Sequence, residues 1–151
     1  MTEGVLEQKL QKKVLMINRV AKKVKGGDKI GFAALVAVGD GKGRLGIGYG
    51  RAKDLRKAIE KGGRQAKTKM FTVPIVRTTI PHRVEVKEGA ARIMIRPAPR
   101  GSGLRAGGVI RDILELAGYK DVSAKILGTR NKMTNAKATV KALRRLENET
   151  K

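Results

Sequence analysis

The stretch that decides the fold of the first half of the chain is LGIGYGRAKDLRKAIEKGGRQAKTKM, residues 45–70. In its first six residues, glycines alternate with larger apolar residues, so a strand here presents one face of bare backbone. From Asp54, a candidate N-cap, small and apolar residues recur at helical spacing instead. Gly62 and Gly63 would each cost the interior of that helix about 1 kcal/mol relative to alanine, which favours a close packing partner. The pattern predicts a strand and a helix that pack through their glycines.

The turn before this strand, GDGKGR (residues 39–44), contributes to a GxGxxG spacing that is typical of dinucleotide-binding loops. Such a loop follows a strand and opens a helix, whose N-terminal amides hold the pyrophosphate. Here the glycines join two predicted strands, and the helix begins only near Asp54. We therefore predict a hairpin turn that exposes Lys42 and Arg44, without a bound cofactor.

Two further strands are predicted upstream, over residues 14–24 and 30–39, where β-branched and apolar residues dominate. The first half thus has the order β-β-β-α. A segment with two prolines, residues 71–82, follows as an extended connection, and we place a domain boundary near residue 73.

The second half is predicted to have the order β-β-α-β-α. Its elements are strands over residues 83–90 and 91–98, a helix over 109–118 with Gly118 as C-cap, a strand over 121–128, and a helix from Asn131. The fold class is therefore α+β with two small domains. The predicted divisions are a polar leader of residues 1–9, a first domain of 10–73 and a second of 74–151.

The chain is strongly basic, with 35 Lys and Arg against 13 Asp and Glu and a net charge of +22. Residues 1–73 carry 18 basic and 6 acidic side chains, and residues 74–151 carry 17 and 7. Both halves are therefore expected to face a polyanion. Charge confined to a basic tail on a neutral domain would instead indicate a flexible arm. Membrane binding is disfavoured because no segment approaches the roughly 18 apolar residues of a spanning helix.

Several kinds of site are excluded or disfavoured by the residue types. Without cysteine, and with His82 as the single histidine, the chain has no disulfide, thiolate metal site or histidine cluster, and a reducing cytosol fits. His82 has no evident catalytic partner and is predicted to be a surface or structural residue. The turn 97–108 resembles the phosphate loop of small-molecule kinases of the galactokinase and homoserine kinase group, but Arg105 and its neighbours replace the usual hydroxyl residues. No small-molecule substrate and no catalysis are expected.

The basic residues form several runs, among them residues 19–29 and 51–69. Each run alone could be a solvated face of a strand or helix. Because the chain has only two Phe, two Tyr and no Trp, the runs favour contacts to phosphates and 2′-hydroxyls over base stacking. Structured, double-stranded RNA is the predicted class of ligand.

The chain resembles the bacterial form of small-subunit ribosomal protein five. Three segments carry the resemblance, in order and with matching separations: INRVAKKVKGGDKIGFAALVAVGDGKGRLGIGYGRA (17–52), GSGLRAGGVIRDILELAG (101–118) and AKILGTRN (124–131). It extends from about residue 10 to 146. The resemblance implies a first domain related to double-stranded-RNA-binding domains and a second with the fold of the kinases named above; a shared fold does not transfer activity.

The resemblance also implies partners and contacts. They are small-subunit ribosomal RNA, ribosomal proteins four and eight, and a position near the messenger entry, with roles in assembly and decoding accuracy in the cytoplasmic ribosome. Three groups of residues match RNA-contacting segments of the family: Asn18, Arg19, Lys25, Gly26 and Gly27, near which spectinomycin acts; Arg44 with Gly46; and Gly128, Arg130 and Asn131. The remaining predicted RNA contacts come from the basic runs and turns: Lys22, Lys23, Lys29, Lys42, Arg51, Lys53, Lys57, Lys61, Arg64 and Arg105.

Four residues depart from the family pattern. Asp28 stands where arginine is common, Arg51 replaces lysine, Arg105 occupies a usually apolar place, and Lys132 a usual proline. The hypothesis is a non-enzymatic structural protein of the small ribosomal subunit. The alternatives are a free-standing double-stranded-RNA-binding regulator, for which the first half would suffice, and a small-molecule kinase.

Overall fold

The computed structural model describes residues 10–24 and 26–150, with backbone alone at positions 22–24, 28, 29 and 150. The predicted leader, residues 1–9, and Lys25 lie outside the described residues. The chain is α+β with two domains, as predicted, and it contains two four-stranded sheets.

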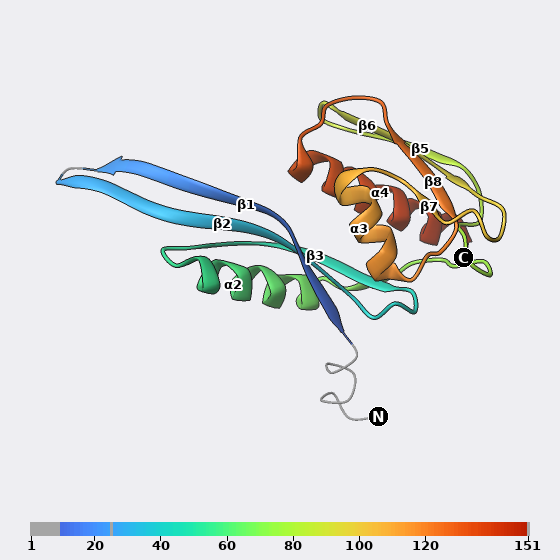
Figure 1. Cartoon of the computed structure of the whole chain (residues 1–151), viewed down its shortest axis with the longest axis horizontal. Helices are drawn as coiled ribbons and strands as arrows, with labels where there is room; N and C mark the ends of the chain where they lie inside the picture. Colours follow the sequence, from blue (N-terminus) through green and yellow to red (C-terminus); the bar gives the residue numbers. More distant parts are fainter. Residues whose placement is uncertain (1–9, 25, 151) are drawn as a thin grey trace.

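The first sheet contains β1 (Gln11–Val24), β2 (Gly27–Gly39), β3 (Arg44–Ala52) and β4 (Phe71–Thr72), in that order. β1 and β2 pair over their whole length, with a register shift between Val14 and Met16. β3 pairs only with the half of β2 from Phe32 to Gly39. The rest of the β1–β2 hairpin is a two-stranded arm that extends away from the body of the protein (Figure 1). We call residues 20–24 and 27–31 the arm.

Helix α2 (Leu55–Thr68) covers one face of this sheet and begins where the sequence predicts, because the Asp54 side chain accepts a hydrogen bond from the Arg56 N–H. The glycine face of β3 lies directly beneath it. A Cβ atom built on Gly48 would stand 2.2 Å from the carbonyl oxygen of Gly62, closer than any real Cβ contact. The predicted packing of strand and helix through their glycines is therefore confirmed.

Helical spacing in the sequence predicts Leu55 and Ile59 on the buried side of α2, together with Gly62 and Ala66, and the structure differs from this in part. Ala58 and Gly63 are buried, whereas Leu55 and Ile59 are only half-buried. The close approach to β3 admits only small residues along the contact line, so the larger residues lie at its margins. The helical spacing in the sequence did not reveal this preference for small residues.

The second sheet has the order β5-β6-β8-β7, formed by β5 (Val84–Glu88), β6 (Ala91–Pro97), β7 (Leu104–Arg105) and β8 (Val122–Ile126). β7 runs parallel to β8, and helix α3 (Gly108–Ala117) connects them. Helix α4 (Lys132–Thr150) packs against β5, β6 and α3. The two short strands β4 and β7 were not predicted, because two residues among glycines or prolines carry no alternating pattern.

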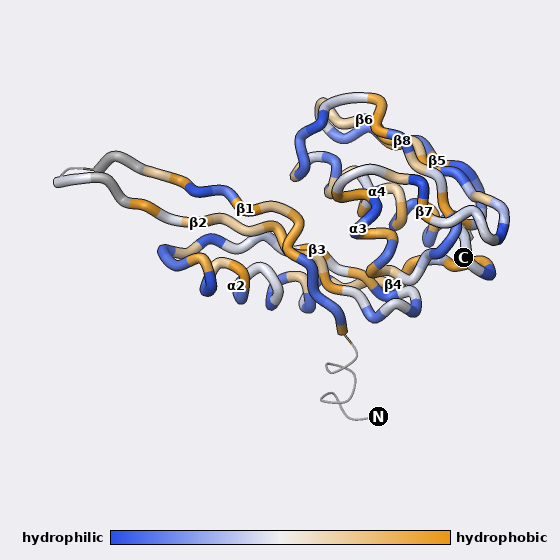
Figure 2. The backbone as a smooth tube through the Cα atoms, viewed as in Figure 1, coloured by the Kyte–Doolittle hydropathy of each residue, from blue (hydrophilic) through white to orange (hydrophobic). Residues whose placement is uncertain are grey.

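Helices α3 and α4 lie between the two sheets, so the molecule is layered as α2, first sheet, α3 with α4, and second sheet (Figure 1). Leu35 and Leu45, on the face of the first sheet opposite α2, belong to the same buried cluster as Ile110 and Leu143 of these helices. Apolar segments of both halves accordingly face one another where the halves meet (Figure 2). The two domains share one hydrophobic core.

The connection between the sheets is fixed to the second half. The Tyr119 hydroxyl donates to the carbonyl oxygen of Pro74, and burial raises the pKa of Tyr119. The N–H groups of Lys120 and Asp121 both donate to the carbonyl oxygen of Thr78, at 3.0 and 3.1 Å. The connection therefore packs as part of the body.

Candidate nucleic-acid interface

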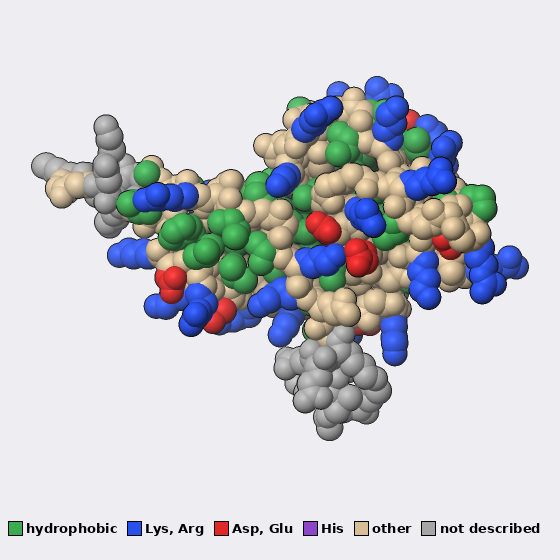
Figure 3. All heavy atoms as spheres, viewed as in Figure 1, with side chains coloured by type: hydrophobic (Ala, Val, Ile, Leu, Met, Phe, Trp, Pro, Cys, Tyr) green, Lys and Arg blue, Asp and Glu red, His purple; other side chains and the backbone are tan. Residues whose placement is uncertain are grey.

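Lys and Arg side chains are spread over both halves of the visible face, with few acidic side chains between them (Figure 3). Five acidic residues pair with cations of the protein itself: Asp112 and Glu115 with Lys13, Glu85 with Arg83 and Arg92, Glu88 with Lys141, and Glu149 with Arg145. The Arg92 guanidinium holds the pKa of Glu85 below its usual value. None of these pairs uses a predicted contact residue whose side chain the structure describes, although Lys61 Nζ donates to the carbonyl oxygen of Arg51 at 3.3 Å.

The first group of predicted contacts lies on the arm and at its base. Asn18 and Arg19 are exposed on β1, opposite Ala33 and Phe32. Beyond them, the backbone register places Lys22 opposite Lys29 and Lys23 opposite Asp28.

The tip of the arm needs glycine at two positions. Gly26 and Gly27 have φ angles of 108° and 138°, and no atom lies within 4 Å of a Cβ built on either. Backbone conformation, and not a close contact, explains these glycines. The tip therefore stands clear of the rest of the protein, as an RNA-contacting loop requires.

The second group lies on the β2–β3 turn, where Lys42 and Arg44 are exposed as predicted. The Asp40 carboxylate accepts hydrogen bonds from the N–H groups of Lys42 and Arg44, at 2.7 and 3.1 Å. This Asp-centred turn fixes the backbone from which the two cations project.

The third group follows β3 and α2. Lys53, Lys57, Lys61 and Arg64 are all exposed, and their spacing of three or four residues places them along one ridge of α2 and the turn before it. Arg51 is exposed, with its guanidinium 5.5 Å from the centroid of the Tyr49 ring. The ridge thus offers a row of exposed cations to an anionic ligand.

The fourth group, in the second half, is less uniform. Arg105 and Arg130 are exposed, on β7 and before α4. The Asn131 side chain instead accepts hydrogen bonds from the N–H and the hydroxyl of Thr134, both at 3.1 Å. Asn131 therefore caps the first turn of α4, which accounts for this residue without a ligand. Gly128 packs against the Ala90 carbonyl, where a Cβ would stand 2.5 Å away.

The structure does not bring all four groups together. Lys42 and the arm tip lie at opposite ends of β2, whose 13 residues span about 40 Å. The candidate interface is therefore extended, and one short RNA segment could not touch all of it. Sequence reasoning also missed three further exposed cations on α2 and at its C-cap: Arg56, Lys67 and Lys69. Their place within the basic run 51–69 was the available signal.

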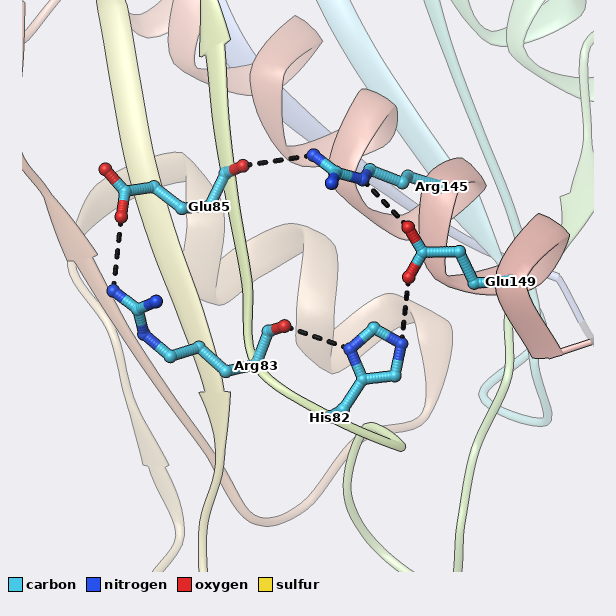
Figure 4. Close-up of polar contacts among 5 residues, drawn as sticks. All are labelled: His82, Arg83, Glu85, Arg145 and Glu149. Carbon is cyan, nitrogen blue, oxygen red and sulfur yellow. Dashed lines mark hydrogen bonds and ion pairs between the residues drawn. The ribbon is translucent and has the colours of Figure 1, made fainter.

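His82 takes part in a network of polar contacts between the start of β5 and the end of α4 (Figure 4). Its Nε2 lies 3.0 Å from a carboxylate oxygen of Glu149, and its Nδ1 lies 2.9 Å from the carbonyl oxygen of Arg83. Arg145 donates to Glu149 at 2.9 Å and to the carbonyl oxygen of Glu85. The Nε2 contact to Glu149 links the residue before β5 to the end of α4, and the Nδ1 contact to the adjacent Arg83 is local, which supports a structural role for His82.

Within residues 10–24 and 26–150, no three His, Cys, Asp or Glu side chains gather as metal ligands would. Among the helices described, none has the length and apolar character needed to cross a bilayer.

Comparison with known proteins gives two matches to family models. Residues 10–74 match "Ribosomal protein S5, N-terminal domain", and residues 86–150 match "Ribosomal protein S5, C-terminal domain". Over 140 residues the chain is 50% identical to "Small ribosomal subunit protein uS5" of Protochlamydia amoebophila (strain UWE25). The alignment covers 93% of this chain and 84% of that relative.

Proposed function

The chain belongs to the ribosomal protein S5 family, and from this premise we propose that its extended basic surface contacts phosphates of small-subunit ribosomal RNA. Its function is that of a structural constituent of the small ribosomal subunit, active in translation. The observation that supports the contact surface is the separation of charges: the ion pairs of the fold use other cations, whereas the exposed cations of α2, the β2–β3 turn and the arm base form no ion pair with a described acidic residue.

The mechanism is phosphate neutralisation by positioned cations. Each phosphate contact releases condensed counterions, so binding depends steeply on salt but carries little base sequence information. The predicted contacts at Lys22, Lys23, Lys25 and Lys29 belong to the same proposal, as do Gly26 and Gly27 at the tip.

Exposed apolar side chains give separate support for a protein that works inside an assembly. Ile17, Val20 and Ile30, on the arm and its base, have exposed fractions of 47%, 42% and 46%. Apolar surface gathered on one projecting element is typical of an interaction site. We expect neighbouring components of the subunit to cover it.

Ribosomal proteins four and eight and the messenger entry region are proposed neighbours, on the strength of the family resemblance. The protein is proposed to act without catalysis, and we expect no ATP turnover from the purified chain. A free-standing regulator built from residues 10–73 is disfavoured because that segment alone would expose Leu15, Leu35 and Leu45, which the shared core buries.

Sedimentation of the full-length chain from a native cell lysate tests the assignment. We expect it to migrate with the small subunit on a sucrose gradient. Protein found free of the subunit would contradict the assignment.

The contact surface has its own test. The combined variant Lys57→Ala, Lys61→Ala and Arg64→Ala should reduce the salt slope of binding to small-subunit ribosomal RNA by about 0.7 to 0.9 for each phosphate that is no longer neutralised. The matched control removes three exposed cations outside the proposed surface: Arg111→Ala, Lys120→Ala and Lys125→Ala. Equal effects of the two combinations would mean that binding follows net charge alone.

A further inference from the structure

A groove of about 280 Å³ lies beside β3, between the C-terminal end of α2 and α4. Its floor is apolar and comes from both halves of the chain: Leu35, Ile47, Met133 and Val140. The groove therefore exists only while the two domains are docked. Its volume lies near the lower end of the range for small-ligand sites, which begins at roughly 300 Å³.

Two of the four aromatic residues of the chain, Tyr49 and Phe71, line this one groove. Both rings are only half-buried. The Arg144 guanidinium lies over the Phe71 ring, 4.4 Å from its centroid, so the ring supports a planar cation that lines the groove. Aromatic rings and guanidinium planes are the surfaces on which proteins stack unpaired bases of RNA. Because the chain has only four aromatic residues, two of them lining one groove favours a role in stacking.

Polar groups of the groove complement an anionic ligand with hydrogen-bonding edges. Lys69, Lys137 and Arg144 are exposed at its margin, and none of its lining residues is acidic. The Gln65 side-chain oxygen accepts a hydrogen bond from the Tyr49 N–H at 2.6 Å. Because this bond fixes the oxygen, the amide nitrogen of Gln65 is the end left to donate to a ligand.

We propose that this groove binds one unpaired nucleotide of RNA, with the base against Tyr49 and the Arg144 guanidinium that Phe71 supports, and the flanking phosphates at Lys69 and Lys137. The proposal rests on RNA being the ligand of the protein, but its site is separate from the α2 ridge and the arm. A paired base hides both faces in the helical stack, so the groove selects a bulged or looped-out nucleotide. The protein would thereby distinguish one irregular position in an RNA that it otherwise holds through phosphates.

Two RNAs that differ by one nucleotide test the proposal with the full-length chain. One is a fully paired duplex of about 16 base pairs, and the other is the same duplex with a single bulged 2-aminopurine nucleotide. We expect the bulged RNA to bind about tenfold more tightly, in line with the contribution of one stacked base. The 2-aminopurine emission should be quenched as the complex forms.

Variants separate the groove from the rest of the surface. Phe71→Leu keeps apolar bulk but removes the ring, so it should abolish the quenching and the preference for the bulge while leaving the paired duplex bound. Lys137→Glu changes an exposed residue and should weaken the bulged RNA selectively; Lys120→Glu, an exposed lysine outside the groove, is its matched control. Selective loss with Lys137→Glu supports the proposal even if Phe71→Leu does not fold.

The remaining outcomes distinguish this proposal from the proposed function. Equal affinity for the two RNAs with unquenched emission overturns the nucleotide site and leaves RNA binding intact. Failure to bind either RNA overturns both. Amide spectra titrated with uridine monophosphate should shift at Gly48 and Tyr49. Shifts there with an alternating glutamate–leucine peptide, but none with the nucleotide, would make the groove a protein-docking site and overturn the proposal.

Discussion

The backbone N–H of Gly43 donates to the carbonyl oxygen of Ala117, the last residue of α3, at 2.8 Å. The N–H of Gly41 donates to Leu116 in the same way, at 2.9 Å. The last carbonyl groups of a helix have no partner within it. The β2–β3 turn of one domain therefore completes the end of a helix in the other, and positive φ angles of 71° and 100° require glycine at both donors.

Gly39→Ala should loosen this docking. A Cβ atom at residue 39 would stand 2.3 Å from the carbonyl oxygen of Leu116. Because this oxygen belongs to the backbone of α3, it cannot move without moving the helix. We expect a loss of about 1 to 3 kcal/mol in the free energy of unfolding, measured by urea denaturation. Faster hydrogen exchange at Gly41 and Gly43 should accompany it. Gly107→Ala is the control for the added methyl group: a Cβ there meets open space, so the only expected cost is that of alanine at the N-cap of α3, and a loss as large as that of Gly39→Ala would contradict the mechanism.

Gly48→Ala tests the packing of β3 on α2. The added methyl group would stand 2.2 Å from the Gly62 oxygen and 2.5 Å from the Ala66 nitrogen, so helix and strand must separate. We expect a loss of about 3 kcal/mol or more in the free energy of unfolding.

The matched control for this change is Gly63→Ala, in α2 next to Gly62. There the nearest atom is the movable Cδ of Lys12, at 3.2 Å, and alanine favours the helix by about 1 kcal/mol. Gly63→Ala should therefore be neutral or stabilising in the same urea experiment. Equal losses at Gly48 and Gly63 would show that the helix interior, and not the contact with β3, decides the effect.

The sequence predicts the packing of the β3 and α2 glycines better than that of the glycines in the β2–β3 turn. For β3 and α2, both partners lie within residues 45–70, and their spacings of two and 3.6 are visible in the sequence. The turn around Gly41 and Gly43 was correctly predicted as a hairpin turn. Its partner, the end of α3, lies more than 70 residues away, and no local pattern links them. Docking between distant elements was therefore beyond prediction from one sequence.

The candidate interface divides in the same way. Exposure of Lys42, Arg44 and the α2 ridge followed from their places in turns and on helical faces, and the structure confirms that exposure. Which cations lie together depends on the length of β2 and the packing of the domains, which the basic runs do not encode. Helical spacing from Asn131 predicts Val140 on the apolar face of the last helix with Ala136 and Leu143, but Val140 is only half-buried and lines the groove beside Lys137. RNA contact by each residue stays a prediction.

Asp121→Asn should alter how stability depends on pH. The buried Asp121 carboxylate accepts hydrogen bonds from the N–H groups of Gly101 and Gly103, at 3.1 and 2.9 Å. Hydrogen bonding, first from the Thr78 side chain and then from these backbone groups, lowers the pKa of Asp121 below its usual value of 3.8. Because the pKa is lower in the folded state, ionised Asp121 stabilises the fold above about pH 4. That stabilisation is lost as the pH falls through the folded-state pKa.

The wild-type protein should accordingly be more stable than Asp121→Asn at pH 7, and the difference should shrink toward pH 3. Urea midpoints measured across this range test it. Glu60→Gln removes one negative charge from an exposed site on α2 and controls for net charge. A difference between wild type and Asp121→Asn that stays constant with pH would mean that shape, and not charge, makes Asp121 important.

The β2–β3 turn contacts α3, and Arg44→Ala tests whether it also contacts RNA. The Arg44 side chain is exposed, while its backbone N–H is held by Asp40, so its removal should change stability by no more than about 0.5 kcal/mol. If the guanidinium neutralises one phosphate, the slope of log affinity against log salt should fall by about 0.7 to 0.9. Arg44→Lys should keep the slope, because the charge remains, but should lose affinity if the contact is bidentate.

Arg83→Ala is the control, because Arg83 is paired with Glu85 at 3.1 Å and its removal should leave the slope unchanged. An unchanged slope in Arg44→Ala would assign this cation to a protein neighbour, and the turn would then serve the docking of the two domains without touching RNA.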